Sequence, residues 1–406
     1  MKIKIRTEND TMIMVVLHVI ILLFTINMIH AESFAQDKRI IVKATNPLDI
    51  NRSHEMIVLK WNILEKLKSI PDPAAICIFD AKTSEELTTQ IIDEDKNGKP
   101  EEVIFFSSFK AKETKQFIID MPCTKDPKSI LPLTYVGYMI PREDVAWEND
   151  RNAFRIYGPA LAKEVNNGID VWTKRVRYPI IEKWYKGDEA PDAARVSYHE
   201  DHGEGADFFS VGKTLGAGSC ALIQNDSLCQ PGVFSTYKIF ATGPIRAIFE
   251  VTYNPVQLNG KSISERKRIT LDAGSNLNKV EVIYTCASSK GKVPFTAGLV
   301  KRKGITTYFD KENRWISLWG LTNEKEENGS LGTGIIMTKE DFSGIREDSV
   351  HVLLLGNAEL GISSTYYTGA AWARSGDFNN ADEWNNYLKE FTLRLKSPLE
   401  ITLEIN

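Results

Sequence analysis

The chain has 406 residues, and its 50 lysines and arginines nearly balance its 54 aspartates and glutamates. This balance excludes nucleic acid as a partner, because phosphate binding needs a basic excess or a basic stripe. Five cysteines, an odd number, exclude a dense disulfide framework. Cys220 and Cys229 flank a short Asn-Asp turn, where either a disulfide or two free thiols would fit.

The first 35 residues have the pattern of a secretory signal. Lys2, Lys4 and Arg6 precede an apolar run of 18 residues, MIMVVLHVIILLFTINMI, and the small residues Ser33 and Ala35 follow. We expect cleavage after Ala35 and export to the periplasm or the medium. A retained anchor is the alternative, because the run approaches the length of a membrane span. No later stretch is apolar enough to cross a bilayer, so we expect no membrane partner after cleavage.

Short alternating runs dominate the remaining sequence and predict β-strands. Five fill residues 39–121, and longer ones follow from about residue 133, such as IRAIFEVTYNPV, in which apolar and polar residues alternate. Asp120–Thr134, DMPCTKDPKSILPLT, contains three prolines and has the composition of a linker. We therefore expect an all-β protein, with a small N-terminal β unit over residues 36–125 and a large antiparallel β-sandwich over residues 126–406.

Only two segments have helical patterns. Gly168–Tyr185, GIDVWTKRVRYPIIEKWY, offers Asp170 as an N-cap and is interrupted at Pro179. Asn380–Lys396, NADEWNNYLKEFTLRLK, begins acidic and ends basic, as the helix dipole favours, and stops before Pro398. The sequence therefore predicts few helices beside the sandwich.

The stretch RVSYHEDHGEGADFFSVGKTLGAG contains two of the six histidines, His199 and His202. With Asp207 or Glu204 they would suit a zinc site, but His-x-x-His spacing fixes no third ligand, so we expect no metal and no other cofactor. A polar loop braced by hydrogen bonds is a second alternative. We favour proton transfer, because imidazole titrates near neutrality and the glycines of this loop let its backbone direct side chains inward. In this interpretation His199 is the base and Tyr198 the acid, with His202 beside them and Glu204 orienting an imidazole.

Other loops mix aromatic rings with arginine or lysine and predict a carbohydrate groove. An indole covers the apolar face of a sugar ring, while guanidinium groups bind hydroxyls or a carboxylate. Solvated charged loops and aromatic packing anchors are the alternative. The cations indicate an acidic oligosaccharide, whose contacts we expect from Arg142, Trp147, Trp184, Arg195, Trp372 and Arg374.

Five motifs, in this order, resemble a family of secreted bacterial proteins catalogued as a domain of unknown function and found with polysaccharide-degradation enzymes. They are NPLDINRSHEMIVL, DEDKNGKPEEVIF, AWENDRNAFRIYGPAL, GIDVWTKRVRYPIIEKWY and YHEDHGEGADFFSVGKTLGAG. The resemblance implies a galactose-mutarotase-like β-supersandwich that acts on uronic-acid oligosaccharides derived from pectin or from the algal polysaccharide ulvan. One branch of the family resembles an ulvan-oligosaccharide dehydratase.

Three functions are compatible with these residues. The first is β-elimination at a non-reducing-end uronate, by a dehydratase or a polysaccharide lyase, which gives a 4,5-unsaturated sugar. The second is a glycoside hydrolase that releases a terminal uronic acid, with two carboxylates drawn from Glu148, Asp150, Glu204 and Asp207. The third is a non-catalytic protein that binds acidic glycans. We favour β-elimination, because titratable groups are dense around His199.

Overall fold

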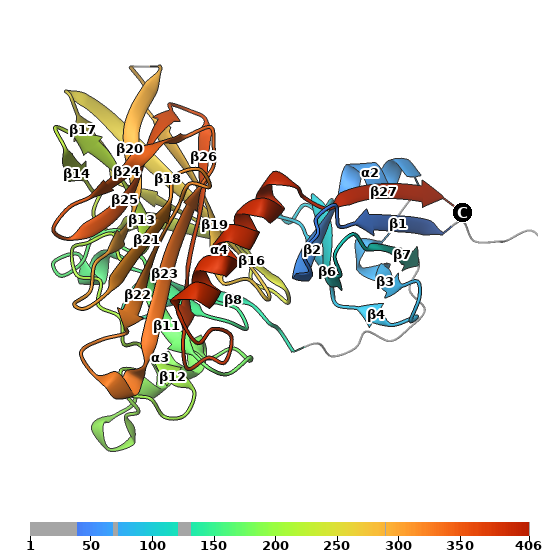
Figure 1. The fold of residues 1–406 in the computed structure, drawn as a ribbon, viewed down its shortest axis with the longest axis horizontal. Helices are drawn as coiled ribbons and strands as arrows, with labels where there is room; N and C mark the ends of the chain where they lie inside the picture. Colours follow the sequence, from blue (N-terminus) through green and yellow to red (C-terminus); the bar gives the residue numbers. More distant parts are fainter. Residues whose placement is uncertain (1–38, 68–71, 121–130, 289, 406) are drawn as a thin grey trace, which may run out of the picture.

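Two β units and one long helix make up the molecule (Figure 1). The structure is a computed structural model, and it describes residues 39–67, 72–120, 131–288 and 290–405. The predicted signal segment, residues 1–35, and most of the predicted Pro-rich linker lie outside the described residues. Among the helices of the described ranges, none combines the length and the apolar character that a membrane span requires.

The N-terminal unit contains two small sheets around a core that includes Val42, Phe105 and Phe117. A three-stranded sheet has the order β2-β6-β5, and a five-stranded sheet has the order β27-β1-β7-β3-β4. The elements of this unit are β1 (Ile40–Thr45), β2 (Arg52–Lys60), α2 (Trp61–Leu67), β3 (Cys77–Asp80), β4 (Glu86–Leu87), β5 (Thr89–Ile92), β6 (Glu102–Phe109) and β7 (Thr114–Asp120), with a 3-10 turn at Pro73–Ala75.

The C-terminal strand β27 (Glu400–Ile405) returns to the N-terminal unit. It lies antiparallel to β1, with Ile405 opposite Ile40. The expected boundary, with everything after residue 126 in the sandwich, is therefore wrong at the end of the chain. Local pattern cannot reveal this pairing, because the two strands are about 360 positions apart.

The large unit is an antiparallel β-sandwich, so the predicted all-β fold with few helices is confirmed. One sheet follows the order β15-β16-β18-β19-β26-β23-β22-β21, with β17 beside β18; a second has the order β14-β13-β20-β25-β24, and a third β12-β11-β10-β9-β8. In β18 buried and outward-facing residues alternate, as the sequence predicts for a strand with one face in a core. Its strands are β8 (Tyr135–Met139), β9 (Asp144–Glu148), β10 (Ala153–Ile156), β11 (Asp170–Lys174), β12 (Gly205–Ala206), β13 (Ala217–Gln224), β14 (Ser227–Cys229), β15 (Phe234–Ala241), β16 (Arg246–Tyr253), β17 (Val256–Leu258), β18 (Lys261–Asp272), β19 (Leu277–Thr285), β20 (Lys292–Val300), β21 (Thr306–Asp310), β22 (Trp315–Leu321), β23 (Ser330–Met337), β24 (Phe342–Glu347), β25 (His351–Glu359) and β26 (Ser363–Trp372), with 3-10 turns at Pro159–Leu161, Asp192–Ala194 and Glu326–Asn328.

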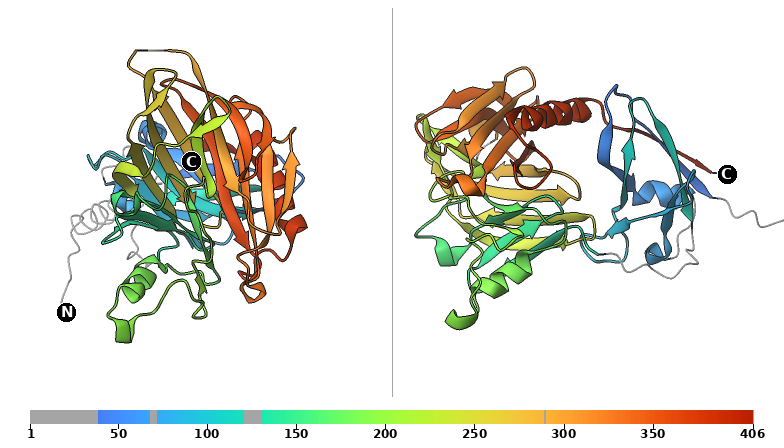
Figure 2. Two further views of the ribbon diagram at one scale, coloured as in Figure 1. Left: turned by 90° about the vertical axis from the view of Figure 1, so that its left-hand side faces the viewer. Right: turned by 60° about the horizontal axis from the view of Figure 1, so that its bottom comes forward.

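The C-terminal helix α4 (Ala381–Lys396) confirms the second helical prediction. The side chain of Asn380 accepts a hydrogen bond from the backbone N–H of Glu383 and caps the helix. One face of α4 buries Trp384 and Leu388 against the nine-stranded sheet. The helix then runs toward the N-terminal unit and delivers β27 to it (Figures 1 and 2).

The first helical prediction is wrong in its first half. Asp170–Lys174 is strand β11, whose five residues are all buried and which pairs with β10 on one side and β12 on the other. A helix begins only after Pro179, as α3 (Ile181–Asp188). The carboxylate of Glu148 caps it from β9, because it accepts hydrogen bonds from the backbone N–H groups of residues 180 and 181, at 2.7 and 2.8 Å.

Cys220 and Cys229 lie on neighbouring strands but form no disulfide. Cys229 lies opposite Leu222 and not opposite Cys220, so the register offsets the two sulfur atoms. Of the two interpretations offered for this pair, free thiols and not a disulfide are therefore correct.

Candidate functional site

The imidazole of His199 is the exposed titratable group at the centre of the site. Its Nδ1 lies 3.1 Å from the backbone carbonyl oxygen of Asp207 and 3.5 Å from the Asp207 Oδ2, while its side chain is 55% exposed. A carbonyl oxygen only accepts hydrogen bonds, so Nδ1 carries the hydrogen and Nε2 has a free lone pair. Within the described residues no hydrogen bond occupies Nε2. The hydrogen bond at Nδ1 therefore orients the ring and leaves Nε2 as the nitrogen available to a ligand.

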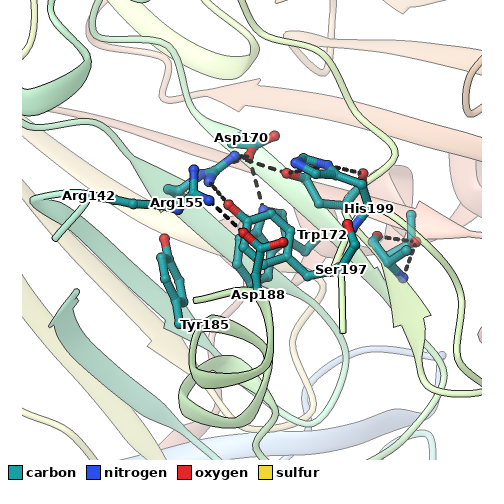
Figure 3. Close-up of polar contacts among 12 residues, drawn as sticks. Arg142, Arg155, Asp170, Trp172, Tyr185, Asp188, Ser197 and His199 are labelled. Atoms are coloured by element: carbon teal, nitrogen blue, oxygen red, sulfur yellow. Dashed lines mark hydrogen bonds and ion pairs between the residues drawn. The ribbon is translucent and has the colours of Figure 1, made fainter. Parts of the chain in front are cut away.

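A buried arginine, Arg155 on β10, fixes the position of Asp207. Its guanidinium donates to the Asp170 Oδ2 at 2.7 and 3.0 Å and to the Asp207 Oδ2 at 2.9 Å, and lies 3.7 Å from the Asp144 Oδ2. It also donates to the Tyr198 hydroxyl at 3.1 Å. Figure 3 shows Arg155, Asp170 and His199 gathered close to the end of α3. Strands β9, β10 and β11 therefore hold the loop that carries His199 through charged groups in the interior.

Three carboxyl groups surround this single guanidinium, so the cluster has an excess of acid. Burial, followed by the neighbouring charge of Asp170, raises the pKa of Asp207 well above its usual range. Burial also raises the pKa of Asp144 to about 6, although Arg155 opposes this. The Oδ1 atoms of Asp144, Asp170 and Asp207 are buried without a hydrogen-bond partner among the described residues. Burial therefore favours the protonated form of Asp144 and of Asp207 relative to a carboxyl group in water.

Two partly exposed arginines converge on Asp188, the last residue of α3. The Asp188 carboxylate is fully buried and accepts from Arg142 at 2.6 Å and from Arg195 at 3.0 Å. The Arg142 guanidinium also lies over the Tyr198 ring, 5.3 Å from its centroid, and that ring is 4.6 Å from the His199 ring. The sequence predicted these two arginines and this histidine as parts of one site, and the fold brings them together around Tyr198.

A cavity of about 230 Å³ opens between α3 and the loop of residues 196–205. Its walls include the predicted residues Trp184, Tyr198, His202 and Glu204, so four predicted residues share it. The indole of Trp184 stacks on Trp172 below it, with ring centroids 5.7 Å apart. The aromatic walls and the polar rim are typical of a small ligand site.

Glu204 does not orient either histidine, so this part of the prediction is wrong. Its carboxylate accepts hydrogen bonds from Tyr178 at 2.6 Å, from Lys183 at 2.7 Å and from the Trp184 indole at 3.1 Å. Burial raises the pKa of Glu204, but the hydrogen bonds from these three donors lower it by more, so the net pKa is below the usual value. His202 is exposed, and its Nε2 lies 3.2 Å from the carbonyl oxygen of Ser197. Glu204 is thus a wall of the cavity, and Asp207 takes the orienting role instead.

The backbone of this loop requires glycine at two positions. Gly203 and Gly205 have φ angles of 98° and 117°, which other residues rarely adopt. A Cβ on Gly205 would lie 2.0 Å from the carbonyl oxygen of Thr173 on β11. The carboxylate of Asp201 accepts from both glycine N–H groups, at 2.8 and 3.1 Å, and pairs with Arg175. The loop therefore has one defined shape rather than many.

Three predicted residues lie outside the site. Trp147 is completely buried and donates its indole N–H to Asn278 at 2.7 Å, and Trp372 is 1% exposed with its indole N–H on the carbonyl oxygen of Asn328. The expectation that these rings face a sugar is wrong, because both point into the core of the sandwich. Arg374 is exposed, stacks beside Trp372 at 5.8 Å, and donates to the carbonyl oxygen of Glu327.

Four buried charged residues were not among the predicted site residues: Asp144, Arg155 and Asp170 of the buried cluster, and Asp188 beside it. For Arg155 and Asp170 the sequence does contain a signal, a charged residue inside an apolar run, in AFRIYG and GIDVW. Such a charge is rarely buried without partners, so each one predicts a second charge beside it. Within the described residues no group of three or more His, Cys, Asp or Glu side chains is arranged to hold a metal ion.

Comparisons with known proteins identify a family for nearly the whole chain. The profile of the family described as "Domain of unknown function (DUF4861)" matches residues 44–401. "Uncharacterized protein P7" from Formosa agariphila is 32% identical over 408 residues, which cover 95% of this chain and 100% of that protein.

Solved structures give only weak similarity. A glycosyl hydrolase family 38 protein and an α-mannosidase, both from Enterococcus faecalis, have TM-scores of 0.45, with 10% and 9% identity. The matches cover 92% and 91% of this chain, which spans about half the length of those proteins (48% and 46%). The sequence matches are far stronger, and on them the chain belongs to the DUF4861 family.

Proposed function

We propose that this protein catalyses β-elimination on a uronate at the non-reducing end of an oligosaccharide, with His199 as the base. The observation that carries the proposal is the half-exposed imidazole of His199, whose Nδ1 donates to the backbone carbonyl oxygen of Asp207. Substrates derived from ulvan or pectin, and export of the protein by the segment 1–35, are parts of the same proposal. They follow from the family resemblance and the N-terminal pattern.

The reaction removes one proton and one leaving group. The Nε2 of His199 takes the proton from C5, the C5–H electron pair becomes the C4–C5 double bond, and the C4–O bond breaks. The proton at C5 is acidic only when the adjacent carboxylate is neutralised. Arg142 and Arg195 are suited to this, because each guanidinium spends only part of its five N–H donors on Asp188.

Tyr198 is the proposed acid for the departing oxygen. Burial raises the pKa of its phenol, so the hydroxyl keeps its proton at neutral pH. Because this oxygen accepts from Arg155, its own hydrogen is free to be donated elsewhere. Tyr198 is 3% exposed and is one of the residues that line the 230 Å³ cavity. At a non-reducing end C4 carries a hydroxyl, which leaves as water in a dehydratase; a lyase would act on a uronate whose C4 oxygen is glycosylated, and the sugar on that oxygen would leave.

Burial of the acidic residues favours elimination over hydrolysis. A glycoside hydrolase needs two carboxylates that flank the scissile bond, roughly 5 to 9 Å apart. Of the four residues considered for this, Glu148, Asp150 and Asp207 are 0%, 6% and 4% exposed, and Glu204 is occupied by three donors. Glu148 is in addition locked to Lys174 at 2.6 Å.

Incubation with ulvan and pectin oligosaccharides, followed by mass spectrometry and near-ultraviolet absorbance, tests the proposal. Dehydration removes about 18 mass units and lyase action splits the chain, and both give an absorbing 4,5-unsaturated product, whereas hydrolysis adds water without such absorbance. His199→Asn should lower kcat by at least about 100-fold, the usual contribution of a general base. Asp226→Asn, in the turn between β13 and β14 with a side chain 97% exposed, is the control with unchanged kcat, and asparagine tolerates its φ of 62°. Mass changes without absorbance, or full activity of the His199 variant, would refute the mechanism.

A further inference from the structure

A second cavity, of about 590 Å³, lies between the two β units and away from His199. Three ion pairs connect its opposite walls: Arg268 with Glu94 at 2.6 Å, Arg246 with Glu102 at 3.4 Å, and Arg394 with Glu55 at 3.5 Å. Gln90 adds hydrogen bonds to the backbone of residues 245 and 246, at 2.8 to 3.0 Å. The N-terminal unit is thereby held at a fixed separation from the sandwich, and the chamber exists before any ligand binds.

The floor of this chamber is the outer face of the nine-stranded sheet. Ile248, Thr270, Lys279 and Tyr367 lie opposite one another on β16, β18, β19 and β26 and form one row across four strands. All four line the cavity. Within the described residues, the hydroxyls of Thr270 and Tyr367 have no hydrogen-bond partner. Burial raises the pKa of Tyr367 to about 12, so its hydroxyl stays neutral and able to donate.

The third wall is one face of α4, between the two β units (Figure 2). Tyr387, Phe391 and Arg394 follow one another at helical spacing and all line the chamber. Phe391 packs edge-on against Tyr367 of the floor, with ring centroids 5.2 Å apart. The guanidinium of Arg394 lies over the Tyr387 and Phe391 rings, 5.6 and 5.0 Å from their centroids, so the unpaired hydroxyls of the floor are the groups open to a ligand.

The charges around the chamber cancel one another. Five lysines and arginines line it together with five aspartates and glutamates. Each cation has an acidic partner from the same lining: besides the three pairs between the walls, Lys60 binds Glu102 at 2.5 Å and Lys279 binds Glu281 at 2.8 Å. A charged ligand would have to displace one of these partners, whereas an uncharged ligand would not.

We propose that this chamber is a second carbohydrate-binding site, for an uncharged, hydroxyl-rich oligosaccharide segment. Hydroxyls of the sugar pair with Thr270 and Tyr367, and the sugar enters without displacing any of the ion pairs. The site differs in chemistry from the Arg142–His199 region, where cations predominate. It is independent of the elimination proposed above, since none of its residues contacts His199.

Isothermal titration calorimetry of the full chain with neutral tetrasaccharides of glucose, xylose, galactose and mannose, and with tetragalacturonate, tests the site. Thr270→Trp places an indole in the chamber and should weaken binding of the neutral probe at least tenfold. Thr306→Trp, on the exposed edge strand β21 of the same sheet, is the matched control and should bind normally. Tyr367→Phe removes one hydroxyl and should weaken binding about fivefold, the size of one hydrogen bond. It keeps the test informative if the Thr270 variant does not fold.

The outcomes separate this site from the proposed reaction. Saturable binding of a neutral probe that survives His199→Asn and is lost in Thr270→Trp supports the chamber, whatever the catalytic assays give. Three outcomes overturn it: no neutral probe binding with Kd below about 10 mM, unchanged binding in both the Thr270 and the Tyr367 variants, or binding only of tetragalacturonate.

Discussion

Replacing Asp144 with asparagine should stabilise the protein at pH 7.5 and leave its stability near pH 4 almost unchanged. Burial raises the pKa of this carboxyl to about 6 from an ordinary 3.8, so the folded state binds the proton more tightly than the unfolded state does. Stability from this group is therefore complete below pH 4 and is lost as the pH rises through 6. A shift of about two pKa units corresponds to about 3 kcal/mol, which the neutral amide recovers. Its oxygen can still accept the hydrogen bond that Tyr185 donates at 3.0 Å.

Urea denaturation followed by tryptophan fluorescence, at pH values from 4 to 7.5, measures this effect. The difference in unfolding free energy between Asp144→Asn and the parent should grow from near zero to about 3 kcal/mol across that range. Asp310→Asn is the control, for which the change in unfolding free energy should have the opposite sign. Burial raises the pKa of Asp310, but hydrogen bonds from Asn313 lower it by more, so the net pKa is below the usual value. That variant should lose stability at neutral pH and little in acid. A constant difference for Asp144→Asn, or a parent that is the more stable at pH 7.5, would refute the reasoning.

Two further predictions concern residues that the fold buries or exposes. Lys174→Met leaves the Glu148 carboxylate buried without its partner and should cost about 3 to 5 kcal/mol in urea denaturation, whereas the double variant with Glu148→Gln should lose less. Equal losses in the single and double variants would contradict a buried charge as the cause. Trp147→Phe should lower stability by about 1 to 3 kcal/mol and leave KM unchanged, because its indole hydrogen bond is internal. Trp184→Ala, in the wall of the 230 Å³ cavity, should instead raise KM roughly tenfold; steady-state kinetics would contradict the assignment if the two variants behaved alike.

The sequence by itself determined the features that depend on neighbouring residues. The alternation of polar and apolar residues along β16 indicates a strand with one buried face, and it predicts this part of the sheet correctly. The acidic start, the basic end and the position of Pro398 predict α4 with nearly the right ends. The clustering of His199, Tyr198 and Arg195 in one loop also follows from their adjacency in the chain. In each case the interactions span a few residues, so the pattern of the chain contains the information.

The tertiary structure decided what depends on partners far along the chain. Gly168–Tyr185 has a helical pattern, yet pairing with β10 and β12 makes its first half a strand, because two ladders outweigh local propensity. Trp147 looked like a surface ring, but its strand directs it into the core. The carboxylate of Asp207, beside His199, is held in the interior by Arg155, about 50 positions earlier in the chain. Burial and ion pairing are set by packing between strands, and no local pattern of residues encodes which strands meet.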